Sequence, residues 1–195
     1  MPSSIEIRAA LRPELLAPAG GAEAMRAAVK NGADAIYFGL SKFSARARVE
    51  NFSAESLSET MDFLRDHNVR GYIALNTLLF RDELSEAARY VEAAAEAGAD
   101  AVIVQDLGVA RLIRRMAPSL PIHASTQMAL AETRDIFQAR KLGISRVILA
   151  RELPIERIRR VIAVGGLPVE VFVHGALCVA RSGLCLASLA IGGRS

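Results

Sequence analysis

The sequence predicts an α/β protein in which helices cover a parallel sheet, arranged as a (β/α)8 barrel of the TIM type that is incomplete at its C-terminus. Short apolar runs recur along the whole chain, and stretches with helical spacing of apolar residues lie between them. The junctions between helix and strand also repeat a Gly-Ala-Asp-Ala pattern. Alternation of strand and helix is typical of a sheet whose strands run parallel.

The apolar runs give seven candidate strands. They are nearly continuous rather than alternating, as expected of strands buried on both faces. The runs cover residues 15–17, 35–38, 72–75, 101–104, 122–124, 147–150 and 169–173.

The stretches between these runs are amphipathic and are predicted to be helices. They cover residues 22–30, 54–66, 83–97, 108–116, 133–142 and 155–164.

Two features favour a barrel over an open sheet. Residues 31–35 and 97–101 each end a helix with Gly and enter a strand through Asp, and residues 142–145 are a looser third copy. No strand is followed by a glycine-rich phosphate-binding motif. A complete barrel usually needs about 250 residues, so we expect about seven βα units here. Residues 1–13 are then an N-terminal extension, and residues 14–195 a barrel domain truncated before its last strand and downstream region.

Composition limits the classes of protein. The chain has 195 residues, 52% of them hydrophobic and 23% charged, with a net charge of +3. These values describe a soluble protein, and the charge permits a nucleic-acid partner without requiring one. We find neither a signal peptide nor an apolar stretch of membrane-spanning length, so we expect a cytoplasmic protein without a membrane partner.

Polar residues gather where the predicted strands end. Reactive groups of barrel enzymes collect at the carboxyl ends of the strands. An alternative explanation for Asp106, Ser125 and Glu152 is that they cap the following helices. The polar residues at these ends are Asn76, Gln105, Asp106, His123, Ser125, Thr126, Gln127, Arg151, Glu152 and His174.

Two histidines and two cysteines are the other candidates. His123 and His174 each follow an apolar strand, so either imidazole is a candidate acid, base or ligand at the barrel mouth, or a buried structural residue. Cys178 and Cys185 have no zinc-ribbon spacing, and two thiols cannot complete a tetrahedral site. The sequence contains no G-x-S-x-G, H-E-x-x-H or cysteine-protease signature, which counts against a peptidase.

Eight segments, in order, resemble the U32 family of collagenase-like peptidases. The likeness covers residues 14–195 and is strongest to a branch of iron–sulfur enzymes that hydroxylate RNA bases. The segments are ELLAPAG (14–20), NGADAIYFG (31–39), FSARA (43–47), LNTL (75–78), VQDLG (104–108), HASTQM (123–128), LAREL (149–153) and VHGALC (173–178).

The resemblance implies a [4Fe-4S] cluster in the full-length form, with Cys178 and Cys185 as two of its ligands. Two more cysteines normally follow a stretch like residues 193–195, where this chain ends, so we expect no cluster bound in this chain. Prephenate is implied as a co-substrate in some RNA cases. The residues implied at the mouth beside the cluster are His123, Gln127, Arg151, Glu152 and His174.

Three functions remain open at this point. An iron–sulfur hydroxylase acting on tRNA or rRNA needs an RNA-binding surface. A peptidase with a peptide substrate would rely on His123 with Glu152 or Asp106. The third is a fragment without activity of its own, and we expect this chain alone to be inactive. The arginines available for RNA are Arg46, Arg48, Arg111, Arg114 and Arg115.

Four structural expectations follow. His123 and His174 should lie at the same, C-terminal, end of the barrel. Without a last strand, the open sheet edge should invite self-association. Cys178 and Cys185 should form no disulfide, because seven helical positions separate them by about 10 Å. Residues 176–195 should be poorly packed or displaced.

Overall fold

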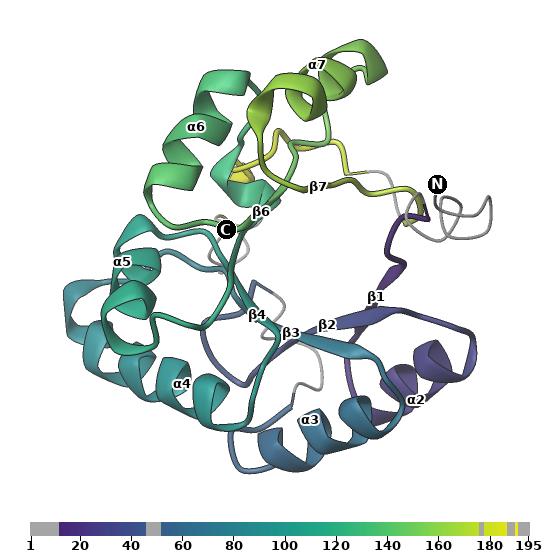
Figure 1. Cartoon of the computed structure of the whole chain (residues 1–195). Coiled ribbons are helices and arrows are strands. Elements are labelled where there is room, and N and C mark those ends of the chain that lie inside the picture. The colour runs from purple at the N-terminus through teal and green to yellow at the C-terminus, as the bar shows by residue number, and fades with distance from the viewer. Residues whose placement is uncertain (1–11, 46–51, 176–177, 187–189, 191–195) are drawn as a thin grey trace, which may run out of the picture.

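A computed structural model describes residues 12–45, 52–175, 178–186 and 190. Its sheet has seven strands in the order β1 to β7, and every adjacent pair runs parallel. The sheet curls into a half-barrel with the helices on its outer side (Figure 1). The predicted alternation of strand and helix is confirmed.

The strands agree with the predicted apolar runs to within a few residues at each end. They are β1 (Leu16–Ala19), β2 (Ala35–Gly39), β3 (Arg70–Leu75), β4 (Ala101–Val104), β5 (Ile122–Ala124), β6 (Arg146–Ile148) and β7 (Val169–Glu170).

The helices between the strands likewise match the amphipathic stretches. They are α2 (Ala22–Lys30), α3 (Leu57–Asp66), α4 (Leu84–Glu96), α5 (Leu107–Met116), α6 (Thr133–Lys141) and α7 (Ile155–Gly165), with the short 3-10 helices η1 (Arg81–Glu83) and η2 (Thr126–Met128).

The two helix-to-strand junctions with the Gly-Ala-Asp-Ala pattern share one backbone conformation and one kind of hydrogen bond. Gly32 and Gly98 have φ angles of 86° and 73°, a conformation in which glycine ends a helix without strain. The aspartate two residues later then binds the backbone of the preceding strand: Asp34 accepts from Leu15 N at 2.7 Å and Asp100 accepts from Gly71 N at 2.8 Å. Each junction therefore fixes its strand beside the one before it.

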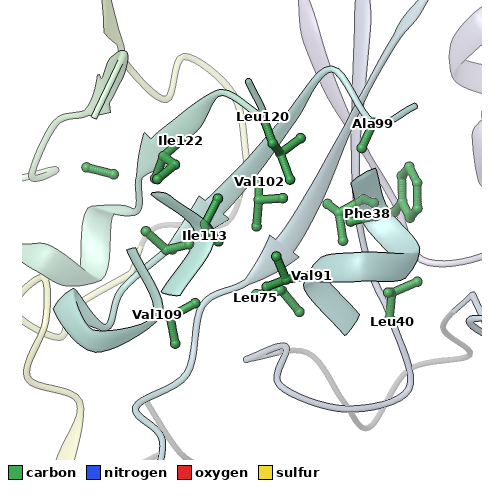
Figure 2. Packing of buried hydrophobic residues seen from close by; sticks show 14 of the residues in the cluster. Phe38, Leu40, Leu75, Val91, Ala99, Val102, Val109, Ile113, Leu120 and Ile122 are labelled. Atoms are coloured by element: carbon green, nitrogen blue, oxygen red, sulfur yellow. The ribbon is translucent and has the colours of Figure 1, made fainter. Parts of the chain in front are cut away.

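The largest hydrophobic core lies between the sheet and its helices. Figure 2 shows part of it, where Val102 of β4 lies near Ile113 of α5 and Leu75 of β3 near Val91 of α4. All four side chains are at most 2% exposed. A second, smaller cluster lines the other face of the sheet, the inside of the barrel, and consists of Leu16, Ala35, Tyr37, Tyr72, Ala101, Ile103 and Ile148.

The sheet is open between its first and last strands. Among the described strands, β1 and β7 each pair on one side only. β7 is also shorter than predicted, because pairing with β6 ends at Glu170 and the apolar run continues without a partner among the described strands. Val171, Phe172 and Val173 are 41%, 51% and 86% exposed. The expectation of a strand over residues 169–173 was therefore wrong beyond Glu170.

Candidate active site

Two amide side chains meet across the mouth of the barrel. Asn76 follows β3 and Gln127 follows β5, and Asn76 Nδ2 donates to Gln127 Oε1 at 2.7 Å. β4 lies between these two strands, so the hydrogen bond passes over its carboxyl end. Ser125 Oγ donates to the same oxygen at 2.8 Å, and Asn76 Oδ1 accepts from Ala45 N at 3.0 Å. Gln127, predicted from the sequence, is thus held at the mouth by Asn76 and Ser125, and Asn76 in turn by the backbone after β2.

Two other strand-end residues act as helix caps. Asp106 Oδ1 accepts from Gly108 N at 2.6 Å and from Val109 N at 3.1 Å, which caps α5. Ser125 Oγ accepts from Gln127 N at 3.3 Å at the start of η2. The capping explanation therefore holds for both residues. It stands alongside a second contact in each case: Asp106 Oδ2 also accepts from Leu79 N at 3.2 Å, and Ser125 also contacts the Gln127 side chain.

Arg151 and Glu152 bind a segment that lies far along the chain. Ser182 Oγ accepts from Arg151 N at 3.2 Å and from Arg151 Nε at 3.4 Å, and Ser182 N donates to Glu152 Oε1. Desolvation opposes ionisation of Glu152, but its hydrogen bonds with Ser182 and the Arg151 charge prevail and lower its pKa. Glu152 does not cap the following helix; it fastens residue 182 to the mouth.

This docking corrects one expectation in part. Residues 176–195 were expected to be poorly packed or displaced, and Val179, Leu184 and Leu186 are 95%, 57% and 67% exposed, yet Ser182 is only 3% exposed. Gly183 has φ +78°, and a Cβ there would lie 2.5 Å from Gln127 O, so the turn packs directly on the loop after β5. Residues 176–177, 187–189 and 191–195 lie outside the described residues.

The two cysteines flank this docked turn. Cys178 is exposed and Cys185 is half-buried, and the structure shows no disulfide between them. Arg181 and Leu184 pair across the turn as an antiparallel bridge. The chain thus reverses direction between the two thiols, instead of carrying them on one regular helix.

A group of charged residues occupies the barrel interior. Arg146 Nη1 lies 2.5 Å from Glu14 Oε1, and Tyr72 OH donates to the same oxygen at 2.9 Å. Arg70 Nη2 lies 2.8 Å from Glu14 Oε2. Glu14 precedes β1, while Arg70 and Arg146 begin β3 and β6, so the group lies toward the amino ends of the strands.

His123 belongs to this interior group. Its ring packs edge-on against Tyr72, with the ring centroids 4.8 Å apart. Burial, and then the positive charge of Arg146, lowers the pKa of His123 to about 3, so the imidazole is neutral. Its Nδ1 is buried without a hydrogen-bond partner among the described residues. We expected this ring to face the mouth, but His123 is the central residue of β5 and projects inward below the strand end.

Glu170 is the second poorly paired group of the interior. Burial raises its pKa to about 7, although Arg146 Nη1 lies 3.9 Å away. His174, predicted to face the same mouth as His123, is exposed beyond the end of β7. Within the described residues, no contact joins either histidine to Glu152 or Asp106. The two histidines therefore do not come together in one site.

Sequence reasoning missed five members of the interior group and one residue at the mouth. A charged residue within or next to an apolar strand was the available signal, as in the Val-Glu-Val run at 169–171. Ser182 carried no signal, because its role depends on how the chain folds back. The missed residues are Glu14, Arg70, Tyr72, Arg146, Glu170 and Ser182.

The predicted RNA-binding arginines have different environments. Arg111 and Arg115 are exposed on α5. Arg114 instead donates to Pro118 O at 2.7 Å and to Leu120 O at 3.2 Å, so it holds the connection from α5 to β5. Arg46 and Arg48 lie outside the described residues. Two of the five arginines are therefore available on the described surface.

A half-barrel with hydrogen-bonding side chains at the carboxyl ends of its strands defines a protein of the β/α-barrel class. The family model described as "Peptidase family U32" matches residues 20–195. The chain belongs to this family, as the sequence resemblance predicted.

Curated relatives carry two kinds of name. The 23S rRNA 5-hydroxycytidine C2501 synthase of Escherichia coli is 39% identical over 94% of this chain, and the tRNA hydroxylation protein P1 of Bacillus subtilis is 33% identical over 91%. A collagenase of Porphyromonas gingivalis is 34% identical over 90%. The chain spans 28%, 42% and 45% of the lengths of these three relatives.

Solved structures support the same fold. The U32 peptidase Mk0906 matches with a TM-score of 0.68 at 11% identity, over 82% of this chain and 68% of that one. A putative lyase/mutase from Burkholderia cenocepacia matches with a TM-score of 0.57 at 17% identity, over 93% and 81%. At these identities the matches establish the barrel fold alone.

Proposed function

We propose that this chain is the barrel part of an iron–sulfur-dependent hydroxylase that modifies a base of tRNA or rRNA. The observation that carries the proposal is the identity of 33–39% to RNA hydroxylation proteins over more than nine-tenths of the chain. The mouth adds support, because Gln127 and Arg151 are hydrogen-bonding groups suited to the oxygens and nitrogens of a nucleotide.

The iron–sulfur part of the proposal rests on the cysteines. Thiolates are the usual ligands of such clusters, and four are normally required. Cys178 and Cys185 lie on either side of the turn docked at the mouth, so they fit as two of the four. Within the described ranges, no three His, Cys, Asp or Glu side chains form a metal site. A bound cluster would supply electrons, and prephenate is a proposed co-substrate.

The chain's own residues have positioning roles in this proposal. Glu152 and Arg151 hold Ser182, and through it the segment that bears both cysteines. Gln127 faces the same turn through its backbone oxygen near Gly183. The cysteine segment and the amide group are thereby kept together at one end of the barrel. His174 is proposed to act near this end, whereas His123 supports the interior.

A peptidase remains the second candidate because of the family name and the collagenase relative. That activity needs an activated nucleophile or a metal-bound water. Its best predicted pair was His123 with Glu152 or Asp106. In the described structure His123 packs on Tyr72, Asp106 caps α5, and Glu152 binds Ser182. These separate engagements favour the hydroxylase.

Location and assembly are part of the proposal as well. None of the described helices combines the length and apolarity needed to cross a bilayer. We propose a cytoplasmic location, because the proposed RNA substrates are made there. The unpaired edges of β1 and β7 are a proposed surface for association, either with further sequence of a longer form or with a second copy.

The test compares nucleosides from cells with and without the gene. Mass spectrometry of digested tRNA and rRNA should show one hydroxylated nucleoside that disappears on deletion and returns with the full gene. Complementation with Cys178→Ser or Cys185→Ser should fail, because each removes a proposed thiolate ligand. Cells bearing Ser119→Ala, at an exposed position after α5, are the matched control and should keep the nucleoside.

The peptidase alternative makes the opposite prediction. Gelatin cleavage by the purified protein that survives iron chelation and replacement of both cysteines, with unchanged RNA nucleosides in the deletion strain, would overturn the hydroxylase proposal. An inactive fragment would give neither signal when this chain alone is expressed in the deletion strain.

A further inference from the structure

The amide groups of Asn76 and Gln127 form a chain whose direction is fixed at one end. Ala45 N is a backbone donor, so the Asn76 atom that lies 3.0 Å from it must be the side-chain oxygen. The NH2 group of Asn76 then points to Gln127 and donates at 2.7 Å. The orientation of the Asn76 amide is therefore set by the backbone after β2.

The same logic sets the orientation of Gln127. Its side-chain atom near Asn76 must accept, because Asn76 presents NH2, and Ser125 Oγ donates to that same atom at 2.8 Å. The opposite orientation would place two NH2 groups against each other. Gln127 Nε2 thus points away from Asn76 and Ser125, and it has no hydrogen-bond partner among the described residues.

We infer that Asn76 is a positioning residue that holds the Gln127 amide so that only its NH2 group faces the mouth, where it donates to an acceptor oxygen or nitrogen of the bound nucleotide. The nucleotide rests on the proposed function, whereas the donor orientation rests on the hydrogen bonds alone. Arg151, fixed by Ser182 beside the same loop, is a second donor. The mouth therefore selects for acceptor groups.

The orientation is tested in the free protein by NMR. Hydrogen exchange of the side-chain NH2 groups should be slow for one proton of Asn76, which is hydrogen-bonded, and fast for both protons of Gln127. A protected Gln127 NH2 beside a rapidly exchanging Asn76 NH2 would overturn the inference.

The substitution Asn76→Asp reverses the direction of the chain without removing it. A carboxylate still accepts from Ala45 N, so the loop after β2 keeps its contact. It cannot donate to Gln127, whose amide should rotate and donate to the new carboxylate. The Gln127 NH2 protons should then become protected. Thr126→Asp adds the same charge one residue from Gln127 and is the control. Its side-chain NH2 groups should exchange as they do in wild type.

Binding of a single-stranded RNA oligonucleotide tests the donor role. Asn76→Asp should weaken binding about three- to tenfold more than Thr126→Asp does, the usual effect of one lost hydrogen bond. Gln127→Ala should show a similar loss, and combining it with Asn76→Asp should add little further. Equal affinities of the Asn76→Asp and Thr126→Asp variants for the RNA would show that the Gln127 NH2 group does not donate to it. If wild type binds no RNA although the exchange pattern holds, the proposed function fails and the orientation stands.

Discussion

Arg146 Nη1 lies 2.5 Å from Glu14 Oε1 inside the barrel and joins the residue before the first strand to the first residue of the sixth. The side chains are only 19% and 15% exposed. Burial opposes both charges, yet the hydrogen bond raises the pKa of Arg146, and the bonds from Arg146 and Tyr72 lower that of Glu14. This pair spans the interior of the sheet between strands that are not neighbours.

Arg146→Met should destabilise the protein by about 3 kcal/mol, because it leaves the Glu14 carboxylate buried without its principal partner. Urea unfolding followed by circular dichroism measures the loss. Lys42→Met, which breaks the exposed pair with Glu86, is the control and should change the free energy of unfolding little. Equal effects of the two substitutions would show that the interior pair contributes no more than a surface pair.

His123 should make the protein sensitive to acid. Its folded-state pKa of about 3 lies below the ordinary 6.5, so the unfolded chain takes up the proton first as the pH falls. The stabilisation is complete above pH 6.5 and is lost progressively toward pH 3. Between pH 7 and pH 5, the free energy of unfolding of wild type should fall by about 2 kcal/mol more than that of His123→Phe. Parallel stability curves for the two proteins would contradict the neutral, buried imidazole.

Glu170 should act in the opposite direction. Its folded-state pKa of about 7 lies above the ordinary 4.5, so its contribution is favourable at low pH and is lost as the pH rises through 7. Between pH 4.5 and pH 8, the free energy of unfolding of Glu170→Gln should therefore rise by about 3 kcal/mol relative to that of wild type. Thermal unfolding at both pH values measures the difference, and an equal effect at both would refute the raised pKa.

Gly183→Ala should lift the cysteine segment from the mouth. The added Cβ would meet Gln127 O at 2.5 Å, and φ +78° is strained for alanine. Reaction of the half-buried Cys185 with a thiol reagent should become several-fold faster, while the exposed Cys178 should change little. Gly32→Ala is the control: it carries the same strain at φ +86° with nothing within 4 Å, and should leave both rates unchanged.

The sequence was sufficient to predict the helices that pack on the outer face of the sheet and the junctions that join them to the strands. Apolar spacing located the helices because each buries one face against the sheet, as Ile113 and Val91 do. The Gly and Asp of the junctions were also readable, since a positive φ and a backbone acceptor are local requirements. Gln127 could be placed at the mouth because it lies three residues after the end of a predicted strand.

The contacts inside the barrel and over its mouth could not be predicted from the sequence in the same way. Successive strand residues point to opposite faces, so the direction of His123 depends on which face of β5 is turned inward. The pairing of Glu14 with Arg146 joins residues 132 positions apart, and no local sequence pattern predicts it. Ser182 reaches Arg151 only because the chain after β7 folds back over the mouth.

The strand order has a consequence for how the chain is made. Every strand pairs only with those next to it in sequence, from β1 through β7. A nascent polypeptide can therefore add one βα unit at a time as it leaves the ribosome, each new strand docking on an edge that already exists. The bond between Arg146 and Glu14 can form only once β6 has emerged. Until then the Glu14 carboxylate has Tyr72 and Arg70 as its available partners.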